Sequence, residues 1–117
     1  MEMIIVKSKI KELVEGFNVA GDFAEALNEV AINLVENAAA RADANGRKTI
    51  QDKDVYIGDI ETETMLVVKS KVKSVVEGFN VSGTFADALN EMLAFFVSQA
   101  ALRAEANGRK TIGARDL

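Results

Sequence analysis

Cationic side chains recur in two short patterns, and each pattern occurs twice. Lysines alternate with other residues near the start of the chain and again at an offset of 62 residues, at Lys7, Lys9, Lys11 and Lys69, Lys71, Lys73. An Arg-Lys-Thr run stands at 47–49 and again at 109–111. Three lysines in the first turns of a helix oppose the helix dipole, which favours anions there. Their presence in both copies predicts an external anion such as phosphate; the alternative is a solvated charged face.

The other residue types in the chain argue against catalysis. The 117 residues include no His and no Cys, which removes the commonest general base, disulfides and thiolate metal sites. The carboxylates are scattered along predicted helix faces. We therefore expect no enzyme, metal, cofactor or small-molecule substrate. No apolar run approaches the roughly 20 residues that span a bilayer, and the N-terminus has no signal-peptide layout, so we expect no membrane association and an intracellular protein.

Both basic patterns belong to an internal duplication. Residues 3–55 align with residues 65–117 without a gap, and 32 of the 53 positions are identical. A unit of about 50 residues is too small to bury a good core alone, and tandem copies indicate one structural unit made twice. We expect a first repeat over 1–57 and a second over 65–117, joined by an acidic connector at 58–64 and paired within one chain. The alternative is that each repeat pairs with another chain.

Each repeat predicts a short helix, a long helix and a short terminal helix, after an apolar run at 3–6 that is compatible with an extended segment. Residues 7–15 show a helical apolar face. Residues 23–44 contain no Gly or Pro and carry an apolar stripe about six turns long. Asp22, or Thr84 in the second repeat, is the expected N-cap of the long helix. Asn45-Gly46 ends this helix, and Thr49 and Thr111 are expected to cap the last one.

The motif Ala-Asn-Gly-Arg-Lys-Thr-Ile at 44–50, with Asp54-Val55 after it, resembles the second loop and last helix of the histone fold. The motif recurs at 106–112, with Asp116-Leu117 after it. The Val-Lys-Ser-Lys run near each start and the minimal last helix resemble the short histone-like proteins of archaea and some bacteria. The resemblance covers nearly the whole chain. It implies an all-α histone doublet, in which two histone-fold repeats form an intramolecular handshake pseudo-dimer.

The resemblance also implies a site. In a histone handshake the long helices cross, and the first loop of one half lies beside the second loop of the other. DNA is gripped at these loops and at the first helices. The corresponding positions here are Lys7, Lys9, Lys11, Arg47, Lys48, Thr49, Lys69, Lys71, Lys73, Arg109, Lys110 and Thr111. In the family, an Arg and an Asp at this spacing form an ion pair, which implies the pairs Arg47–Asp54 and Arg109–Asp116. We therefore expect the arginines to be mainly structural and Lys48 and Lys110 to contact phosphate.

Acidic residues oppose this assignment in part. The net charge is −4 and the sequence pI is about 4.9, which argues against a strong nonspecific polyanion binder. The second repeat has lost some of its acidity, because Ser74, Thr84 and Ala114 replace Glu12, Asp22 and Asp52. We therefore expect the second half to be the more DNA-facing one. No aromatic residue is interleaved with the basic ones, so stacking on single strands is not indicated.

The two copies also differ on one face of the long helix. Asn33 aligns with Phe95, and Ala40 aligns with Leu102. These positions are expected to face outward, so the second repeat alone would expose an apolar stripe. Such patches mark interfaces, and Phe95 and Leu102 are candidates for self-association into a dimer of doublets. The alternative is that the segment at 55–60 or the connector covers them.

Together these observations predict a nucleoid-associated protein that binds double-stranded DNA with modest affinity, bending or bridging it without reading its sequence. The alternative is a histone-fold module of a larger protein assembly that does not bind DNA. The lysines present in both copies favour the first function. The net charge and the Phe95/Leu102 stripe favour the second.

Overall fold

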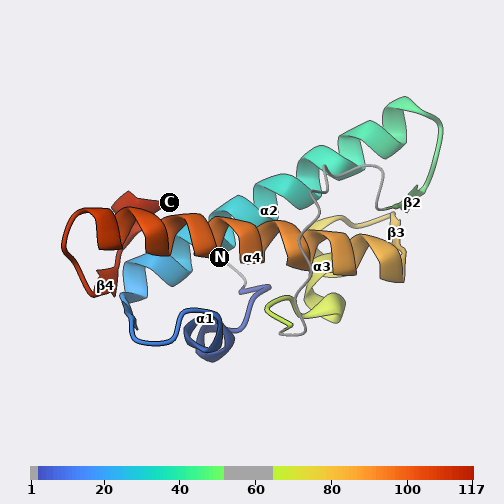
Figure 1. Ribbon diagram of the computed structural model, residues 1–117. Coiled ribbons are helices and arrows are strands. Elements are labelled where there is room, and N and C mark those ends of the chain that lie inside the picture. The colour runs from blue at the N-terminus through green and yellow to red at the C-terminus, as the bar shows by residue number, and fades with distance from the viewer. Residues whose placement is uncertain (1–2, 52–64) are drawn as a thin grey trace.

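Two long helices cross at the centre of the molecule, and two short helices lie on one side of the crossing (Figure 1). The computed structural model describes residues 3–51 and 65–117. The first repeat contains α1 (Lys7–Leu13), β1 (Asn18–Val19), α2 (Gly21–Ala44) and β2 (Thr49–Ile50). The second contains α3 (Lys69–Val75), β3 (Asn80–Val81), α4 (Gly83–Ala106), β4 (Thr111–Ile112) and the 3₁₀ helix η2 (Ala114–Asp116). This arrangement confirms the predicted all-α fold, in which the two repeats pair within one chain.

Within residues 3–51 and 65–117, backbone hydrogen bonds join the repeats at three places. β1 pairs in parallel with β4, and β2 pairs in parallel with β3. Each strand pair therefore combines the first loop of one repeat with the second loop of the other. The extended segments that precede the short helices meet at an antiparallel bridge between Ile5 and Val67. The overall body is elongated, measuring 48 × 29 × 21 Å.

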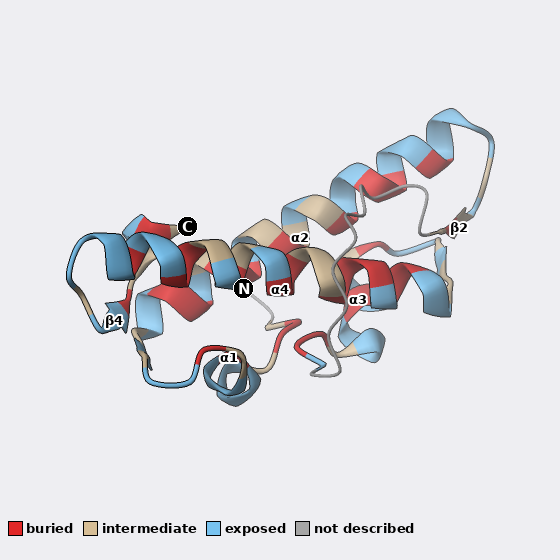
Figure 2. Ribbon diagram, in the orientation of Figure 1, coloured by how far each residue is buried: buried red, intermediate tan, exposed pale blue. Residues whose placement is uncertain are grey.

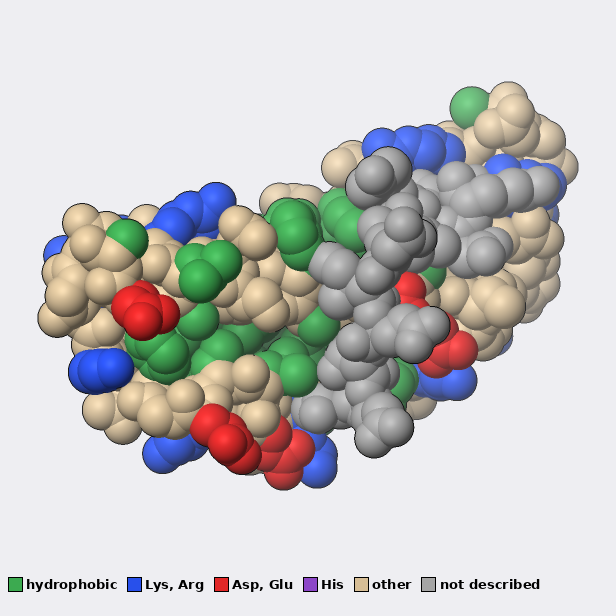
Figure 3. Space-filling view, in the orientation of Figure 1, with side chains coloured by type: hydrophobic (Ala, Val, Ile, Leu, Met, Phe, Trp, Pro, Cys, Tyr) green, Lys and Arg blue, Asp and Glu red, His purple; other side chains and the backbone are tan. Residues whose placement is uncertain are grey.

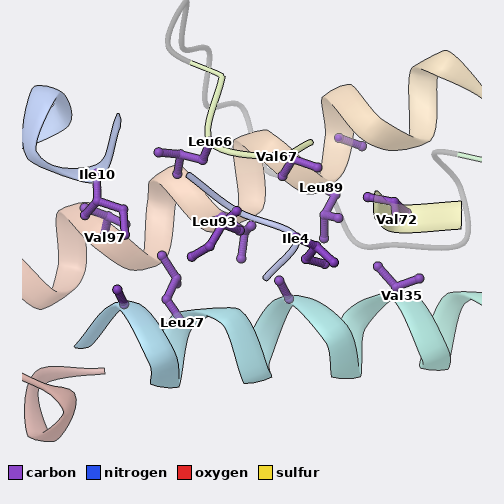
Figure 4. Packing of buried hydrophobic residues seen from close by; sticks show 14 of the residues in the cluster. Ile4, Ile10, Leu27, Val35, Leu66, Val67, Val72, Leu89, Leu93 and Val97 are labelled. Carbon is purple, nitrogen blue, oxygen red and sulfur yellow. The ribbon is translucent and has the colours of Figure 1, made fainter. Parts of the chain in front are cut away.

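The core lies between the long helices and beneath the extended segments. Figure 4 shows side chains from both repeats meeting there, among them Leu27 and Val35 of α2 and Leu89, Leu93 and Val97 of α4. The buried residues of α2 and α4 face inward toward this contact, while the outer faces of both helices are exposed (Figure 2). Because the core uses side chains of both repeats, neither repeat buries its apolar face without the other.

Two buried asparagines fix the extended segments to the core. Asn28 in α2 is 1% exposed, and its side-chain oxygen accepts a hydrogen bond from the backbone N–H of Ile4 at 2.8 Å. Asn90 in α4 is 2% exposed and accepts from Leu66 N–H at 2.6 Å and from Val67 N–H at 3.2 Å. These bonds satisfy amide groups that would otherwise be buried without a partner. Each extended segment is therefore held by the long helix of its own repeat.

The predicted helix caps were wrong. α2 begins at Gly21 with Ala20 at the N-cap, and Asp22 lies inside its first turn. α4 begins at Gly83, where Ser82 rather than Thr84 is the cap and its hydroxyl accepts from Phe85 N–H at 3.1 Å. A cap must lie just before the first helical residue, and both helices start earlier than the apolar stripe indicated.

Thr49 and Thr111 are not helix caps either. Both lie in strands that pair with the other repeat. In the second repeat, η2 begins after Gly113, whose N–H donates to the Asp116 carboxylate at 2.8 Å. Asp22 reaches across the repeats and accepts from Ala114 N–H at 3.3 Å, at the start of η2. The carboxylate expected to cap its own helix therefore contacts the terminal turn of the opposite repeat.

Candidate nucleic-acid interface

A glycine turn positions each basic loop directly after a long helix. Gly46 and Gly108 have φ angles of +72° and +69°, in the left-handed region that glycine tolerates. At the end of α2, Gly46 N–H donates to Asp43 C=O and Arg47 N–H donates to Ala42 C=O, at 3.0 and 2.9 Å. This is the Schellman pattern that ends helices, and it confirms the predicted helix end at Asn45-Gly46. The same bonds recur at the end of α4, so both Arg-Lys-Thr runs leave their helices in the same conformation.

The strand pairs then bring each basic loop against the first loop of the opposite repeat. Asn18 N–H donates to Lys110 C=O at 2.7 Å, and Asn80 N–H donates to Lys48 C=O at 2.7 Å. The pairing also aligns Asn18 with Thr111 and Asn80 with Thr49. Lys48 and Lys110 are thus placed by contacts between repeats, at opposite ends of the body.

Lys7 and Lys11 of α1, and Lys69 of α3, lie close to these strand pairs. Lys7 and Lys11 border a surface hollow together with β1 and the start of α2. Lys69 lies beside the start of α4, since its ammonium would be 3.9 Å from a Cβ added at Gly83. We call the first surface the α1 end (Lys7, Lys9, Lys11, Lys110, Thr111). The second is the α3 end (Lys69, Lys71, Lys73, Lys48, Thr49).

Each end therefore combines first-helix lysines of one repeat with the loop lysine of the other. Lys and Arg side chains are visible at both extremities of the molecule in Figure 3. No single half of the sequence forms an end, because each end takes residues from both repeats. The preference expected for the second half therefore becomes a preference between the two ends.

The two ends differ in their nearby acidic groups. At the α1 end, the ammonium of Lys9 lies 3.6 Å from the Glu12 carboxylate, and both side chains are exposed. At the α3 end, Ser74 occupies the position of Glu12, and its hydroxyl donates to Lys71 C=O at 2.6 Å. At the α3 end, the ammonium of Lys48 lies 3.9 Å from the Asp43 carboxylate. Such exposed pairs are weak, so the lysines can exchange them for an external phosphate.

The Arg109 side chain joins the second loop of its repeat to η2 through an ion pair with Asp116. Its guanidinium donates two hydrogen bonds to the Asp116 carboxylate, at 2.6 and 2.7 Å, and the Asp116 side chain is 1% exposed. Arg103 also donates to Asp116 C=O at 2.8 Å. In the first repeat, Arg47 donates to Thr49 C=O at 3.3 Å, while the expected partner Asp54 lies outside the described residues. Arg109 is held by Asp116, so Lys110 is the better placed cation for a phosphate.

The Arg109–Asp116 ion pair makes the stability of the folded protein depend on pH. Hydrogen bonds from Arg109 lower the pKa of Asp116 from 3.8 to about 2. A carboxyl whose pKa is depressed by folding stabilises the protein above its unfolded pKa, and this contribution is lost as pH falls toward the folded pKa. We therefore expect native protein to melt several degrees above an Asp116→Asn variant at pH 6, with the gap closing between about pH 4 and pH 2. Thermal melts by circular dichroism check this, and a gap that is independent of pH would contradict it.

Two apolar side chains on the outer face of α4 are exposed. Phe95 is 38% exposed and Leu102 is 59% exposed, as expected from the divergence between the repeats. The Phe95 ring also contacts Phe96, with the centroids 6.1 Å apart. Ala88, seven residues before Phe95, is buried, so the exposed stripe does not extend to it.

Sequence reasoning missed two features of the site. The rings of Phe17 and Phe79 are half-buried against the core, and each also lies beneath the loop lysine of the opposite repeat. The role of Asn28 and Asn90 was not foreseen, although an Asn inside an apolar stripe of both repeats is a usable signal. Among the described residues, no group of three or more His, Cys, Asp or Glu could hold a metal ion. No helix in residues 3–51 or 65–117 is long and apolar enough to cross a membrane.

The fold can be compared with solved structures. The chain is similar to the histone from Methanopyrus kandleri, with a TM-score of 0.63 and 17% sequence identity, over 96% of this chain and 89% of that one. At this level of identity the likeness establishes the fold, and the chain has the histone fold. No protein-family model and no curated protein matches the sequence.

Proposed function

We propose that this chain is an architectural protein that binds double-stranded DNA without reading its sequence. The observation that carries the proposal is the pair of basic ends, each of which combines lysines of one short helix with the Lys-Thr step of the other repeat. Ammonium groups, hydroxyls and backbone N–H groups are the donors that proteins use on DNA phosphates, and such contacts carry no sequence information. The likeness to a solved histone supports the same function.

The size of the body suits a duplex rather than a small anion. Its long axis of 48 Å corresponds to roughly 14 base pairs at about 3.4 Å per pair. Phosphates gripped at both ends of one rigid body would belong to the same stretch of duplex, which the protein would then bend, or to two stretches, which it would bridge. A nucleoid-associated location follows from this function.

We expect the α3 end to bind phosphate more strongly than the α1 end. Both ends carry three short-helix lysines and one loop lysine, but Ser74 and Thr84 replace the acidic Glu12 and Asp22 at the α3 end. A carboxylate near a phosphate costs binding free energy through like-charge repulsion. The weaker grip at the α1 end, together with the net charge of −4, accounts for a modest overall affinity.

Fluorescence anisotropy with two labelled duplexes of about 30 base pairs and unrelated sequence tests this function. Phosphate contacts predict equal affinities, within about twofold, for the two sequences. A strong preference for one sequence would contradict nonspecific binding. Absence of binding to both duplexes at low salt, by protein whose circular dichroism shows it folded, would contradict DNA binding altogether.

The exposed Phe95 and Leu102 favour a second candidate function, a histone-fold module that assembles with other proteins. A second copy of this chain is the simplest partner, because the stripe occurs once per chain and α2 carries Asn33 and Ala40 at the matching positions. Hydrophobic side chains reach the surface on the face shown in Figure 3. Self-association and DNA binding are compatible, since the stripe and the basic ends involve different residues.

Replacing Phe95 by Asn and Leu102 by Ala, which are close to the first-repeat residues, should prevent this association. If the stripe is a dimer interface, native protein has about twice the 12.6 kDa mass of one chain, and the variant has the mass of one chain. Light scattering coupled to size-exclusion chromatography measures both. An unchanged mass in the double variant would rule out this interface.

A further inference from the structure

Each loop lysine that we assign to DNA lies over an aromatic ring of the opposite repeat. The ammonium of Lys48 is 5.2 Å from the centroid of the Phe79 ring, and that of Lys110 is 5.3 Å from the centroid of Phe17. Both distances lie within the range of about 6 Å in which a cation is attracted to the face of a ring. The contact is made twice, with the roles of the repeats exchanged.

The backbone explains why the ring and the lysine meet. Phe79 immediately precedes Asn80, whose N–H donates to the carbonyl of Lys48 at 2.7 Å. The ring is partly buried and packs against the hydrophobic core, so its position is fixed by the fold. The Lys48 side chain is 73% exposed. Its ammonium therefore has the ring on one side and, apart from the Asp43 carboxylate at 3.9 Å, is open to solvent.

A ring at this position changes how much conformational entropy the lysine loses when it binds a ligand. A free lysine samples many rotamers, and ordering it at an interface lowers the binding affinity. Attraction to the Phe79 ring, 5.2 Å away, would leave Lys48 fewer rotamers to lose on binding. The Asp43 carboxylate, 3.9 Å from the same ammonium, is the competing contact. An ammonium over a ring keeps its remaining N–H donors available for a phosphate oxygen, because the ring face occupies one side of it.

We propose that Phe17 and Phe79 are positioning residues that hold the loop lysine of the opposite repeat ready for phosphate. This inference rests on the proposed function, because it specifies how the DNA contact is prepared. It also makes the grip depend on the pairing of the repeats, since the lysine and its ring belong to different repeats at both ends. The lysine covers the ring face, which leaves that face unavailable for stacking on a base.

A double-mutant cycle tests the proposal. Phe79→Leu keeps an apolar side chain but removes the ring, and it should weaken duplex binding roughly two- to fivefold. In a Lys48→Ala background the same substitution should have no effect, because no ammonium remains to be positioned. Phe79→Tyr keeps a ring and should bind as the native protein does. Anisotropy with one 30-base-pair duplex measures the affinity of the native protein and of the four variants, which are Phe79→Leu, Lys48→Ala, the double variant and Phe79→Tyr.

Controls separate positioning from folding. Phe96→Leu removes a half-buried ring of α4 that lies outside both basic ends, and it should leave affinity unchanged. Phe79→Met serves as a second ringless variant if Phe79→Leu does not fold by circular dichroism. An equal loss from Phe79→Leu in both backgrounds, or no loss in either, would overturn the positioning role.

One readout does not depend on DNA. In the native protein, NMR signals of the Lys48 side-chain methylenes should be shifted upfield by the ring, and Phe79→Leu should abolish the shift. If the shift is present and native protein fails to bind any duplex, the proposed function fails and the positioning role falls with it. If native protein binds and the ring variants bind equally well, the positioning role alone is wrong.

Discussion

Replacing both Lys48 and Lys110 by Ala is expected to lower the affinity for a 30-base-pair duplex by roughly a hundredfold at low salt. A hydrogen bond to a charged group contributes about 1.5–3 kcal/mol, and each 1.4 kcal/mol corresponds to about tenfold in affinity. One such contact is lost at each end of the body. The slope of log K against log salt should also become shallower by about two, since each phosphate contact contributes about 0.9.

A charge-preserving variant provides the matched control. Lys48→Arg with Lys110→Arg retains both cations and should bind within a few fold of the native protein. The thermal midpoint should change little in either double variant, because the Lys48 side chain is largely exposed and its pair with Asp43 is weak. Native affinity in the double alanine variant would show that the loops do not contact DNA.

Asn90→Ala is expected to destabilise the fold by about 2–4 kcal/mol, because it leaves buried amide groups without partners. The backbone N–H groups of Leu66 and Val67 both donate to the Asn90 side chain. Val67 also forms the bridge to Ile5 that joins the two repeats. The loss should therefore affect the pairing of the repeats as well as the local segment. Urea unfolding measures the free energy of unfolding, which for small proteins totals only about 5–15 kcal/mol.

An exposed asparagine of α2, the long helix of the other repeat, serves as the control. Asn33 lies on the outer face of α2, and Asn33→Ala should change the free energy of unfolding by no more than about 0.5 kcal/mol. An Asn90→Ala variant as stable as the Asn33→Ala variant would show that the extended segments are not held by this side chain.

Sequence alone predicted the local features that occur in both repeats. The duplication indicated two pairing units, and the run around Gly46 correctly located the end of the long helix, because only a left-handed turn there requires glycine. The Arg109–Asp116 ion pair followed from spacing and resemblance. These features are local, so a pattern of a few residues determines them.

The features that sequence did not predict depend on contacts between repeats. Thr49 and Thr111 had the pattern of helix caps, but strands of two residues become stable only when the opposite loop lies beside them. Asp22 was assigned to its own helix and contacts the other repeat instead. Phe17 and Phe79 each contact a lysine of the opposite repeat, and this contact exists only because the loops are paired.

Duplex binding across a salt series tests whether the lysines of the α1 end and the α3 end bind phosphates of double-stranded DNA. Anisotropy of a labelled 30-base-pair duplex should give a linear plot of log K against log salt, with a slope steeper than about −4 if five or more of the eight proposed lysines make contact. Folded protein that does not bind at low salt, or whose binding is unaffected by salt, would contradict the account.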